Sequence, residues 1–419
     1  MSNSSDTPSK RTLAKAIAVF GGAQAFTVLA AAVRVKFAAI YIGTAGFGLT
    51  ALYGTFTNLL STLMGCGLAN SSVPSLCQAE GEEQQMAVAR LRLVGCILAL
   101  ASVPVSLIAA MFYSSEAMWL AIPVAATLMG GIEMAVMKSL KATRLLTQSL
   151  VLTAVFSMAL TVPFYMLMGV RGAIWGVSSC MTVSGLYTCW LGYKACHVLP
   201  DFSQLNKGLW RQVRPMFVLG VAFLISGVLA QGVDLLCQMC LEAVATLTMV
   251  GLYKAGYQLA VTYTGMIFTA IANDFFPRLS GIVHDIDARN RLITQQVRVL
   301  LLIVTPAIAL FIVLVPWIVP LLFSDEFLPV IPMVRVAALS VIVKAIYMPM
   351  GYLPVALGRS WHFLLIEAAS WTILALGVLL GYHWGGLLGV GFGLLFCNVT
   401  DLLLVWLFCR RLYAFKFLK

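Results

Sequence analysis

Residues 299–323 read VLLLIVTPAIALFIVLVPWIVPLLF, an apolar run of 25 residues that contains no charged side chain. An α-helix needs about 20 apolar residues to cross the hydrocarbon core of a bilayer. The run is continuous, whereas the strands of a membrane β-barrel alternate apolar and polar residues. Val299–Phe323 is therefore predicted to be a transmembrane helix.

Similar runs extend in both directions and occupy most of the chain. Of its 419 residues, 61% are hydrophobic and only 10% are charged, whereas about a quarter of the residues in a soluble domain are charged. So few charges cannot cover a surface that faces water, and lipid is the expected solvent. The sequence predicts an all-α polytopic membrane protein with twelve transmembrane helices: Ala14–Ile42, Leu49–Leu76, Leu93–Tyr113, Ala117–Met137, Leu146–Met168, Ala173–Tyr193, Met216–Leu241, Leu247–Phe276, Val299–Phe323, Ile331–Ala356, Phe363–Tyr382 and Leu387–Phe408.

The distribution of basic residues predicts the topology. The net charge is +11, but 21 of the 27 Lys and Arg residues fall in segments on one side of the predicted membrane. Only Arg171 falls in a loop on the other side, and five lie inside spans. Loops rich in Lys and Arg stay in the cytoplasm, so both termini are expected there. The basic excess thus indicates topology and does not indicate nucleic-acid binding.

Sequence signatures of catalysis and of bound cofactors are absent. The chain has no Gly-x4-Gly-Lys-Ser/Thr loop for a nucleotide, and no Ser-His-Asp set with usable spacing. Its ten cysteines lie mostly within spans, where they act as small apolar side chains. Neither a metal nor a cofactor is expected, although coupling to a gradient of H⁺ or Na⁺ remains open.

An internal repeat predicts two parallel six-helix bundles. Gly48–Leu76 aligns with Gly251–Leu279 with six identities in 29 positions, and both segments form the second span of a half. The pattern Gly169-x2-Gly172-x3-Gly176 returns as Gly386-x2-Gly389-x3-Gly393 between the last two spans of each half. Halves with an even number of spans keep the same orientation in the membrane. The predicted parts are a cytoplasmic N-terminus (1–10), two bundles (11–194 and 216–408), an amphipathic linker helix on the inner membrane surface (195–215) and a basic cytoplasmic tail (409–419).

Basic residues inside spans are the first candidates for a functional site. A charge at the centre of the bilayer costs about 2.5–3.5 kcal/mol on insertion scales, so it usually faces a cavity or a partner. Arg34 and Lys36 lie about 200° apart around their helix, so only one of them can face a cavity squarely, and which one stays open. Lys254 and Lys344 lie farther from the ends of their spans, and both are predicted to face an aqueous or anion-lined cavity.

The acidic residues inside spans form the second group. Asp234 lies well within its span, and it can pair with Lys254 or with a cation of the first span, or serve as an ion-coupling carboxylate. Four acids occupy the cytoplasmic portions of their spans, and they are expected to make gate or interface contacts with nearby Arg and Lys residues: Glu133, Asp274, Glu367 and Asp401.

A further set of motifs occurs in order along nearly the whole chain: Lys36 with Gly43-x2-Gly46-x-Gly48-Leu49, Phe276-Pro277-Arg278-Leu279-Ser280, Asp287, Pro306, Leu322-Phe323-x3-Phe327, Lys344, Ala356-Leu357-Gly358-Arg359, Glu367 and Gly386-x2-Gly389. This set resembles the motifs of the bacterial O-antigen and polysaccharide flippases, especially the lipid III flippase type. That family belongs to the multidrug/oligosaccharidyl-lipid/polysaccharide exporter superfamily. The family's usual Gly-Pro after the first span is replaced by Gly43-Thr44 in this chain.

The resemblance implies a MATE-like transporter of the bacterial inner membrane that flips an undecaprenyl-diphosphate-linked oligosaccharide by alternating access. Arg34, Lys36, Lys254 and Lys344 are then the candidates to bind the diphosphate, because phosphates need cations in a medium of low dielectric constant. Expected partners are the polyprenyl-linked glycan, membrane lipids and other proteins of polysaccharide assembly. Two alternatives stay open: a drug or small-molecule antiporter of the same fold, and a glycan polymerase or ligase, which the short outer loops disfavour.

Overall fold

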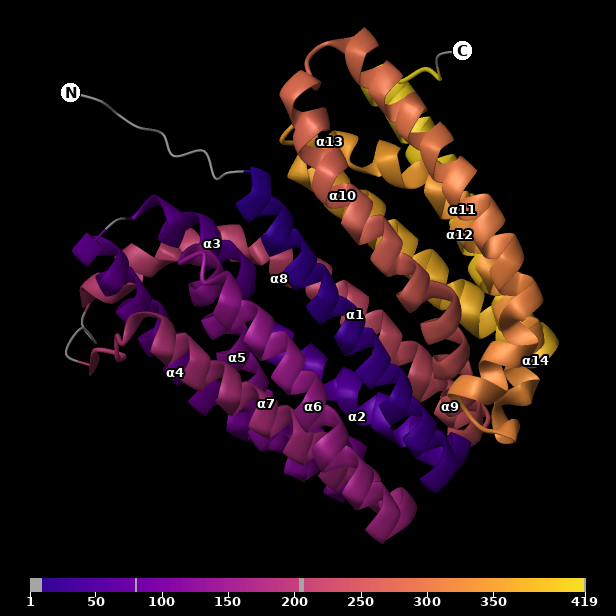
Figure 1. The fold of residues 1–419 in the computed structure, drawn as a ribbon, viewed down its shortest axis with the longest axis horizontal. Helices are drawn as coiled ribbons and strands as arrows, with labels where there is room; N and C mark the ends of the chain where they lie inside the picture. Colours follow the sequence, from indigo (N-terminus) through magenta and orange to yellow (C-terminus); the bar gives the residue numbers. More distant parts are fainter. Residues whose placement is uncertain (1–9, 80, 203–206, 418–419) are drawn as a thin grey trace. The chain divides into compact units, whose positions relative to one another are not determined.

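The computed structural model describes residues 10–79, 81–202 and 207–417, and these residues form helices joined by short turns (Figure 1). Three short 3-10 helices (η1, η2 and η5) and one π-helical turn (η4) interrupt the α-helices. In chain order the elements are α1 (Lys10–Tyr41), α2 (Gly43–Met64), α3 (Leu68–Gln78), α4 (Gly81–Tyr113), η1 (Ser115–Leu120), α5 (Ala121–Ser139), α6 (Thr143–Met168), η2 (Gly169–Arg171), α7 (Gly172–Cys196), α8 (Lys207–Val244), α9 (Leu247–Tyr257), η4 (Gln258–Thr262), α10 (Tyr263–Ile282), α11 (Ile286–Leu322), η5 (Asp325–Val330), α12 (Ile331–Gly351), α13 (Leu353–Ala356) and α14 (Ser360–Tyr413).

The helices account for twelve membrane spans. Eight stretches are long and apolar enough to cross a membrane. Two of them, Thr143–Cys196 and Trp361–Tyr413, turn back at a glycine and therefore contain two spans each. The helix pairs α2 with α3 and α9 with α10 supply the remaining two spans, both of which are interrupted. The prediction of an all-α, twelve-span membrane protein is confirmed.

The helices gather into two compact units whose borders fall inside helices. Unit 1 comprises Met1–Tyr41 and Phe56–Leu224, and unit 2 comprises Ile42–Thr55 and Ile225–Lys419. The first part of α2 thus belongs with the C-terminal helices, and the first part of α8 belongs with the N-terminal ones. This division differs from the sequence-based boundaries, which placed all of α2 in one bundle and began the other at Met216.

The start of α2 is held in unit 2 by close helix contact. Gly48 of α2 meets Gly251 of α9 with no side chain between the backbones, so a Cβ atom on Gly48 would lie 2.5 Å from the carbonyl oxygen of Leu247. Phe47 packs edge-on against Phe323 at 5.8 Å between ring centroids. Gly48 and Gly251 are the first pair of the sequence repeat, and the repeat therefore places small residues where two spans touch.

The expected linker helix is the beginning of α8 and not a separate helix. α8 runs without a break from Lys207 to Val244 through Pro215. Val213 and Met216 are buried in the core of unit 1, where the cluster around them includes Leu76 and Val88. The apolar face of the segment is therefore covered by protein rather than by the membrane surface, and Leu205 lies outside the described residues.

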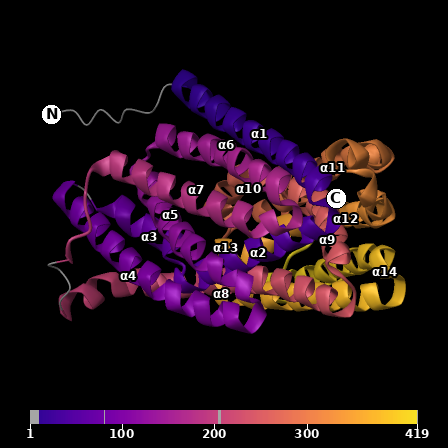
Figure 2. The ribbon, with the colours of Figure 1, turned by 90° about the horizontal axis from the view of Figure 1, so that it is seen from below.

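The second repeat corresponds to two helical hairpins with the same backbone turn. Gly169 has φ 56° and ψ −136°, and Gly386 has φ 55° and ψ −139°. Behind each turn a glycine touches the preceding arm eight residues back: Gly172 meets the carbonyl of Phe164, and Gly389 meets that of Gly381. Figure 2 shows the arms α6 and α7 lying side by side. Equal turns and equal spacings support duplication of a six-span half.

Replacing Gly389 with alanine should destabilise the α14 hairpin. The added Cβ would lie 1.9 Å from the carbonyl oxygen of Gly381, and the backbone of the opposite arm must move to accept it. Overpacking of this kind costs about 1–3 kcal/mol. The apparent melting temperature of the purified protein in detergent measures the effect. Gly281→Ala is the matched control, because a Cβ there meets nothing within 4 Å and its melting temperature should be unchanged.

Candidate functional site

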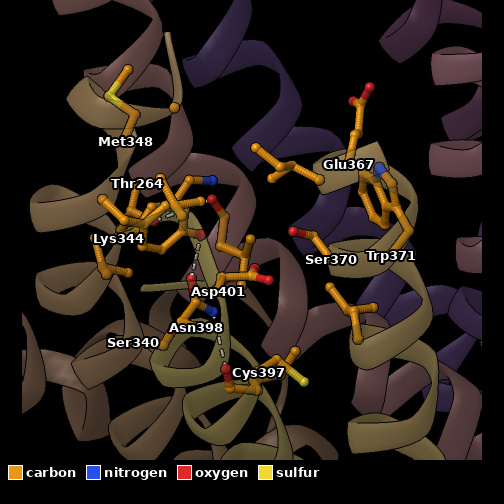
Figure 3. A pocket seen from close by; sticks show the side chains of 18 of the residues that line it. Thr264, Ser340, Lys344, Met348, Glu367, Ser370, Trp371, Cys397, Asn398 and Asp401 are labelled. Carbon is orange, nitrogen blue, oxygen red and sulfur yellow. Dashed lines mark hydrogen bonds between the residues drawn. The ribbon is translucent and has the colours of Figure 1, made fainter. Parts of the chain in front are cut away.

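Unit 2 contains a pocket of about 360 Å³ that both arms of α14 line together with η4, α10 and α12. We call it the unit 2 pocket (Figure 3). Three residues that the sequence singled out separately line it: Lys344, Glu367 and Asp401. Its other polar and aromatic lining residues are Tyr257, Thr264, Ser340, Tyr347, Tyr352, Phe363, Ser370, Trp371 and Asn398.

Asp401 lies in the middle of the unit 2 pocket. Figure 3 shows it between Lys344 on one side and Ser370 and Trp371 on the other. The residue is 8% exposed, and its carboxylate accepts a hydrogen bond from Ser370 and interacts electrostatically with Lys344. Its Oδ1 has no hydrogen-bond partner among the described residues. Lys344 in turn lies 5.7 Å from the ring centroid of Phe268, which gives its ammonium an aromatic face.

Two further polar groups complete the pocket wall. The Tyr347 hydroxyl donates to Oδ1 of Asn398 at 2.9 Å, and Nδ2 of Asn398 donates to the carbonyl of Leu394 at 3.0 Å. These two bonds hold the amide in one orientation. Glu367 accepts a hydrogen bond at 2.8 Å from Ser226 of α8 through Oε1, while its Oε2 is buried without a partner among the residues that the structure describes.

Lys254 and Asp234 form an ion pair elsewhere in unit 2, which is the first of the pairings that the sequence allowed for Asp234. Nζ of Lys254 lies 2.5 Å from Oδ2 of Asp234, and the two side chains are 20% and 21% exposed. Thr55 donates to the same carboxylate oxygen at 3.3 Å, and Gln238 donates to the Thr55 hydroxyl at 3.0 Å. The pair therefore belongs to a network that joins α2, α8 and α9 while its charges stay partly exposed.

Arg34 and Lys36 belong to unit 1. Nη1 of Arg34 donates to the Ser157 hydroxyl of α6 at 2.8 Å. Tyr165 and Cys180 also lie within electrostatic reach of its guanidinium, so the side chain points toward α6 and α7. Lys36 is half-buried on the same helix. These two candidates and the two lysines of unit 2 thus lie in different units.

Glu133 pairs with Arg92, one of the 21 Lys and Arg residues that the sequence predicts outside the spans on one side of the membrane. Arg92 of α4 donates from Nε to Oε1 at 2.7 Å and from Nη2 to Oε2 at 2.6 Å. The two side chains are only 3% and 4% exposed. Nη1 of Arg92 also donates to the carbonyl of Val198, just past the end of α7. The signal in the sequence was the presence of opposite charges at the neighbouring ends of the third and fourth spans.

A second arginine that sequence reasoning missed makes a similar contact in unit 2. Arg289, near the start of α11, is 6% exposed and donates to the carbonyls of Val283 and Tyr413. In each six-span half, an arginine of the third span therefore contacts a carbonyl at the end of the sixth span. Asp274 lies in α10, but its side chain lies outside the described residues.

The chain is similar to a known protein family in sequence and to known transporters in fold. A family model described as "Polysaccharide biosynthesis protein" matches residues 41–332. The fold is similar to an inward-facing multidrug resistance MATE family transporter of the MOP superfamily, with TM-score 0.71, 13% identity and coverage of 93% of this chain and 95% of that one. It is also similar to the lipid II flippase MurJ in its inward closed conformation, with TM-score 0.65, 15% identity and coverage of 93% of this chain and 87% of that one. A third similar structure is the bent form of the Vibrio cholerae MATE transporter VcmN, with TM-score 0.59, 16% identity and coverage of 95% of this chain and 96% of that one. No curated protein sequence matches the chain.

Proposed function

Because the chain belongs to the polysaccharide biosynthesis protein family, we propose that it flips an undecaprenyl-diphosphate-linked oligosaccharide from the inner to the outer leaflet of the bacterial cytoplasmic membrane. The resemblance to polysaccharide flippases is thereby confirmed at the level of the family. The chain is a multi-pass membrane protein whose fold is that of transporters and flippases.

The partly exposed cation within a span, Lys254, carries the proposal. A lipid-linked diphosphate needs a positive charge at membrane depth, and charge-assisted hydrogen bonds to phosphate are strong where the dielectric constant is low. Lys254 is 20% exposed although it is paired with Asp234, so a phosphate oxygen can take the place of the carboxylate. Lys344, Arg34 and Lys36 are the further cations that we assign to the passage of the diphosphate.

The mechanism proposed is alternating access. Lys and Arg concentrate on one side of the spans, which supports cytoplasmic termini and loading from the cytoplasm. The diphosphate and sugars would pass along the polar and charged side chains inside the spans, while the polyprenyl tail stays in lipid. Alternating access then exposes these side chains to one side of the membrane at a time.

Transport in reconstituted vesicles tests the proposal. Purified protein is placed in liposomes with a fluorescent undecaprenyl-diphosphate-linked oligosaccharide, and the fraction of label that reaches the outer leaflet is measured with a membrane-impermeant quencher. We expect the labelled oligosaccharide lipid to be transferred only when the protein is present. A labelled phospholipid that carries no glycan should not be transferred. If the protein transfers none of several lipid-linked glycans, the proposal is contradicted.

A drug antiporter is the second candidate, because the chain shares its fold with a MATE transporter at TM-score 0.71. The same vesicles distinguish the two candidates. A MATE-like antiporter should move a cationic dye against a proton or sodium gradient and leave the lipid-linked oligosaccharide in place. A flippase should move the lipid-linked oligosaccharide and leave the dye in place. Movement of the dye alone would favour the antiporter.

A further inference from the structure

The unit 2 pocket has the composition of a small carbohydrate site. The Asp401 carboxylate, the Asn398 amide and the Ser370 hydroxyl lie on the same side of the pocket as one another and next to Trp371, and the Glu367 carboxylate lies farther from them (Figure 3). A sugar ring has hydroxyl groups around its edge and a face of C–H groups, so it needs both polar partners and an apolar or aromatic surface. The volume of about 360 Å³ lies at the small end of the range for ligand pockets.

The pocket contains hydrogen-bond acceptors that lack donors. Among the described residues, Oδ1 of Asp401 and Oε2 of Glu367 have no partner, and both atoms are buried. An ionised carboxylate can only accept hydrogen bonds. A buried acceptor without a donor costs free energy until a ligand supplies one. Sugar hydroxyls are donors of the right kind, and they carry no charge that Lys344 would repel.

A bound cation explains the pocket less well. Lys344 already supplies a positive charge that interacts with Asp401. Within the part of the chain that the structure describes, no group of three His, Cys, Asp or Glu residues could hold a metal ion. A hard cation in a protein usually takes six or more oxygen ligands at short distance. The ammonium of Lys344 would oppose its entry.

We propose that the unit 2 pocket binds one sugar of the transported glycan and thereby selects which glycan the protein accepts. The proposal rests on the flippase function inferred above. Asp401 and Glu367 accept hydrogen bonds from hydroxyls, and Trp371 covers the C–H face of the ring. A site that hydrogen-bonds hydroxyls rejects an analogue that lacks them, because its own polar groups then stay unpaired.

Binding of two lipids by the full chain in nanodiscs tests the proposal. One probe is bare undecaprenyl diphosphate, and the other is the undecaprenyl-diphosphate-linked oligosaccharide extracted from cells that make it. We expect the intact protein to bind the glycosylated lipid more tightly than the bare lipid. Asp401→Asn and Trp371→Leu should each weaken binding of the glycosylated lipid by about tenfold. Trp371→Leu, which removes no charge, should leave binding of bare undecaprenyl diphosphate unchanged.

Thr400→Ala is the matched control. Thr400 neighbours Asp401 on α14, its hydroxyl donates to the carbonyl of Phe396 at 2.9 Å, and it lines an apolar groove rather than the unit 2 pocket. Its affinities for both lipids should equal those of the unchanged protein. Unaltered binding of the bare lipid also shows that each variant is folded. If Asp401→Asn fails this check, Ser370→Ala, which removes one pocket hydroxyl, takes its place.

The outcomes separate the two proposals. Binding of neither lipid by the unchanged protein would contradict the flippase function itself. Equal affinity for both lipids, or the same preference in Asp401→Asn and Trp371→Leu as in the unchanged protein, would overturn the sugar site while the flippase proposal stands. Loss of transport by Asp401→Asn with unchanged lipid preference would assign Asp401 to ion or proton movement and would equally overturn the sugar site.

Discussion

Replacing Lys254 with alanine should abolish flipping of the labelled lipid-linked oligosaccharide in vesicles. The ammonium lies in unit 2 beside Asp234, and without it the diphosphate meets an unbalanced carboxylate at membrane depth. The loss of one charge-assisted hydrogen bond to phosphate should lower affinity about tenfold to a hundredfold. Repulsion between Asp234 and the phosphates adds to this loss. Lys36→Ala should act in the same direction.

The charge of the substituent distinguishes binding from stability. Lys254→Arg should retain part of the activity, because the positive charge survives although its hydrogen-bond geometry differs. Lys254→Glu should be the least active variant, since it places like charge against the phosphates. If the role of the pair is binding and not stability, the amount of folded protein should be the same in every variant.

Two results would contradict this role for Lys254. If the Lys254→Ala variant flips the lipid at the full rate, Lys254 does not bind the diphosphate. The Lys254→Ala change could also lower the amount of folded protein, and adding Asp234→Asn could restore it. That result would show that the pair is structural. Thr55 donates to Asp234 and Gln238 donates to Thr55, so the Asp234→Asn variant alone is a useful reference for such an effect.

The spans were predictable because lipid imposes a long apolar run on each of them. Several helices begin and end close to the predicted positions. α4 and α11 are exceptions: their predicted spans began at Leu93 and Val299, whereas the helices begin at Gly81 and Ile286. Apolarity ends at the membrane surface, but the helix continues into water, and hydropathy cannot detect that continuation.

The borders of the two units could not be read from the sequence. Hydropathy reports which residues face lipid and not which helices contact one another. The repeat did mark Gly48 and Gly251 as equivalent, yet their direct contact follows only from three-dimensional placement. That contact draws the start of α2 into unit 2.

The candidate site was predictable residue by residue but not as a group. The cost of charge in the bilayer singled out Lys344, Glu367 and Asp401, but their spacing of 23 and 34 residues along the chain gave no sign that they line one pocket. The aromatic side chain of Trp371 carried no signal at all, because tryptophan is common in membrane helices. Arg92 was missed because it was counted with the loop charges that set topology.

Replacing Glu133 with leucine should destabilise unit 1 more than any other single change considered. The Arg92 side chain is only 3% exposed. In the variant its positive charge would stay buried without the two carboxylate oxygens that now pair with it. Removing one partner of a buried ion pair costs about 3–5 kcal/mol, because the other charge stays buried without compensation. Arg92→Met should cost a similar amount for the same reason, with Glu133 left unpaired. Apparent melting temperature in detergent is the measurement.

The double variant Arg92→Met/Glu133→Leu should recover most of the stability that either single variant loses. Replacing a whole buried ion pair by apolar side chains is often neutral or stabilising. The residual loss should reflect the carbonyl of Val198, which Arg92 no longer contacts. A double variant as unstable as the sum of the two single ones would refute the coupling of these charges.

Transport by the double variant then decides whether the Arg92–Glu133 pair is only structural. If the pair serves only to hold α4 against α5, a double variant with restored melting temperature should flip the labelled lipid at the normal rate. If it is the cytoplasmic gate contact that the position of Glu133 suggested, the pair must break and re-form during the cycle. Apolar substitutes can hold the helices together but cannot exchange charge partners, so the double variant should be folded and slow.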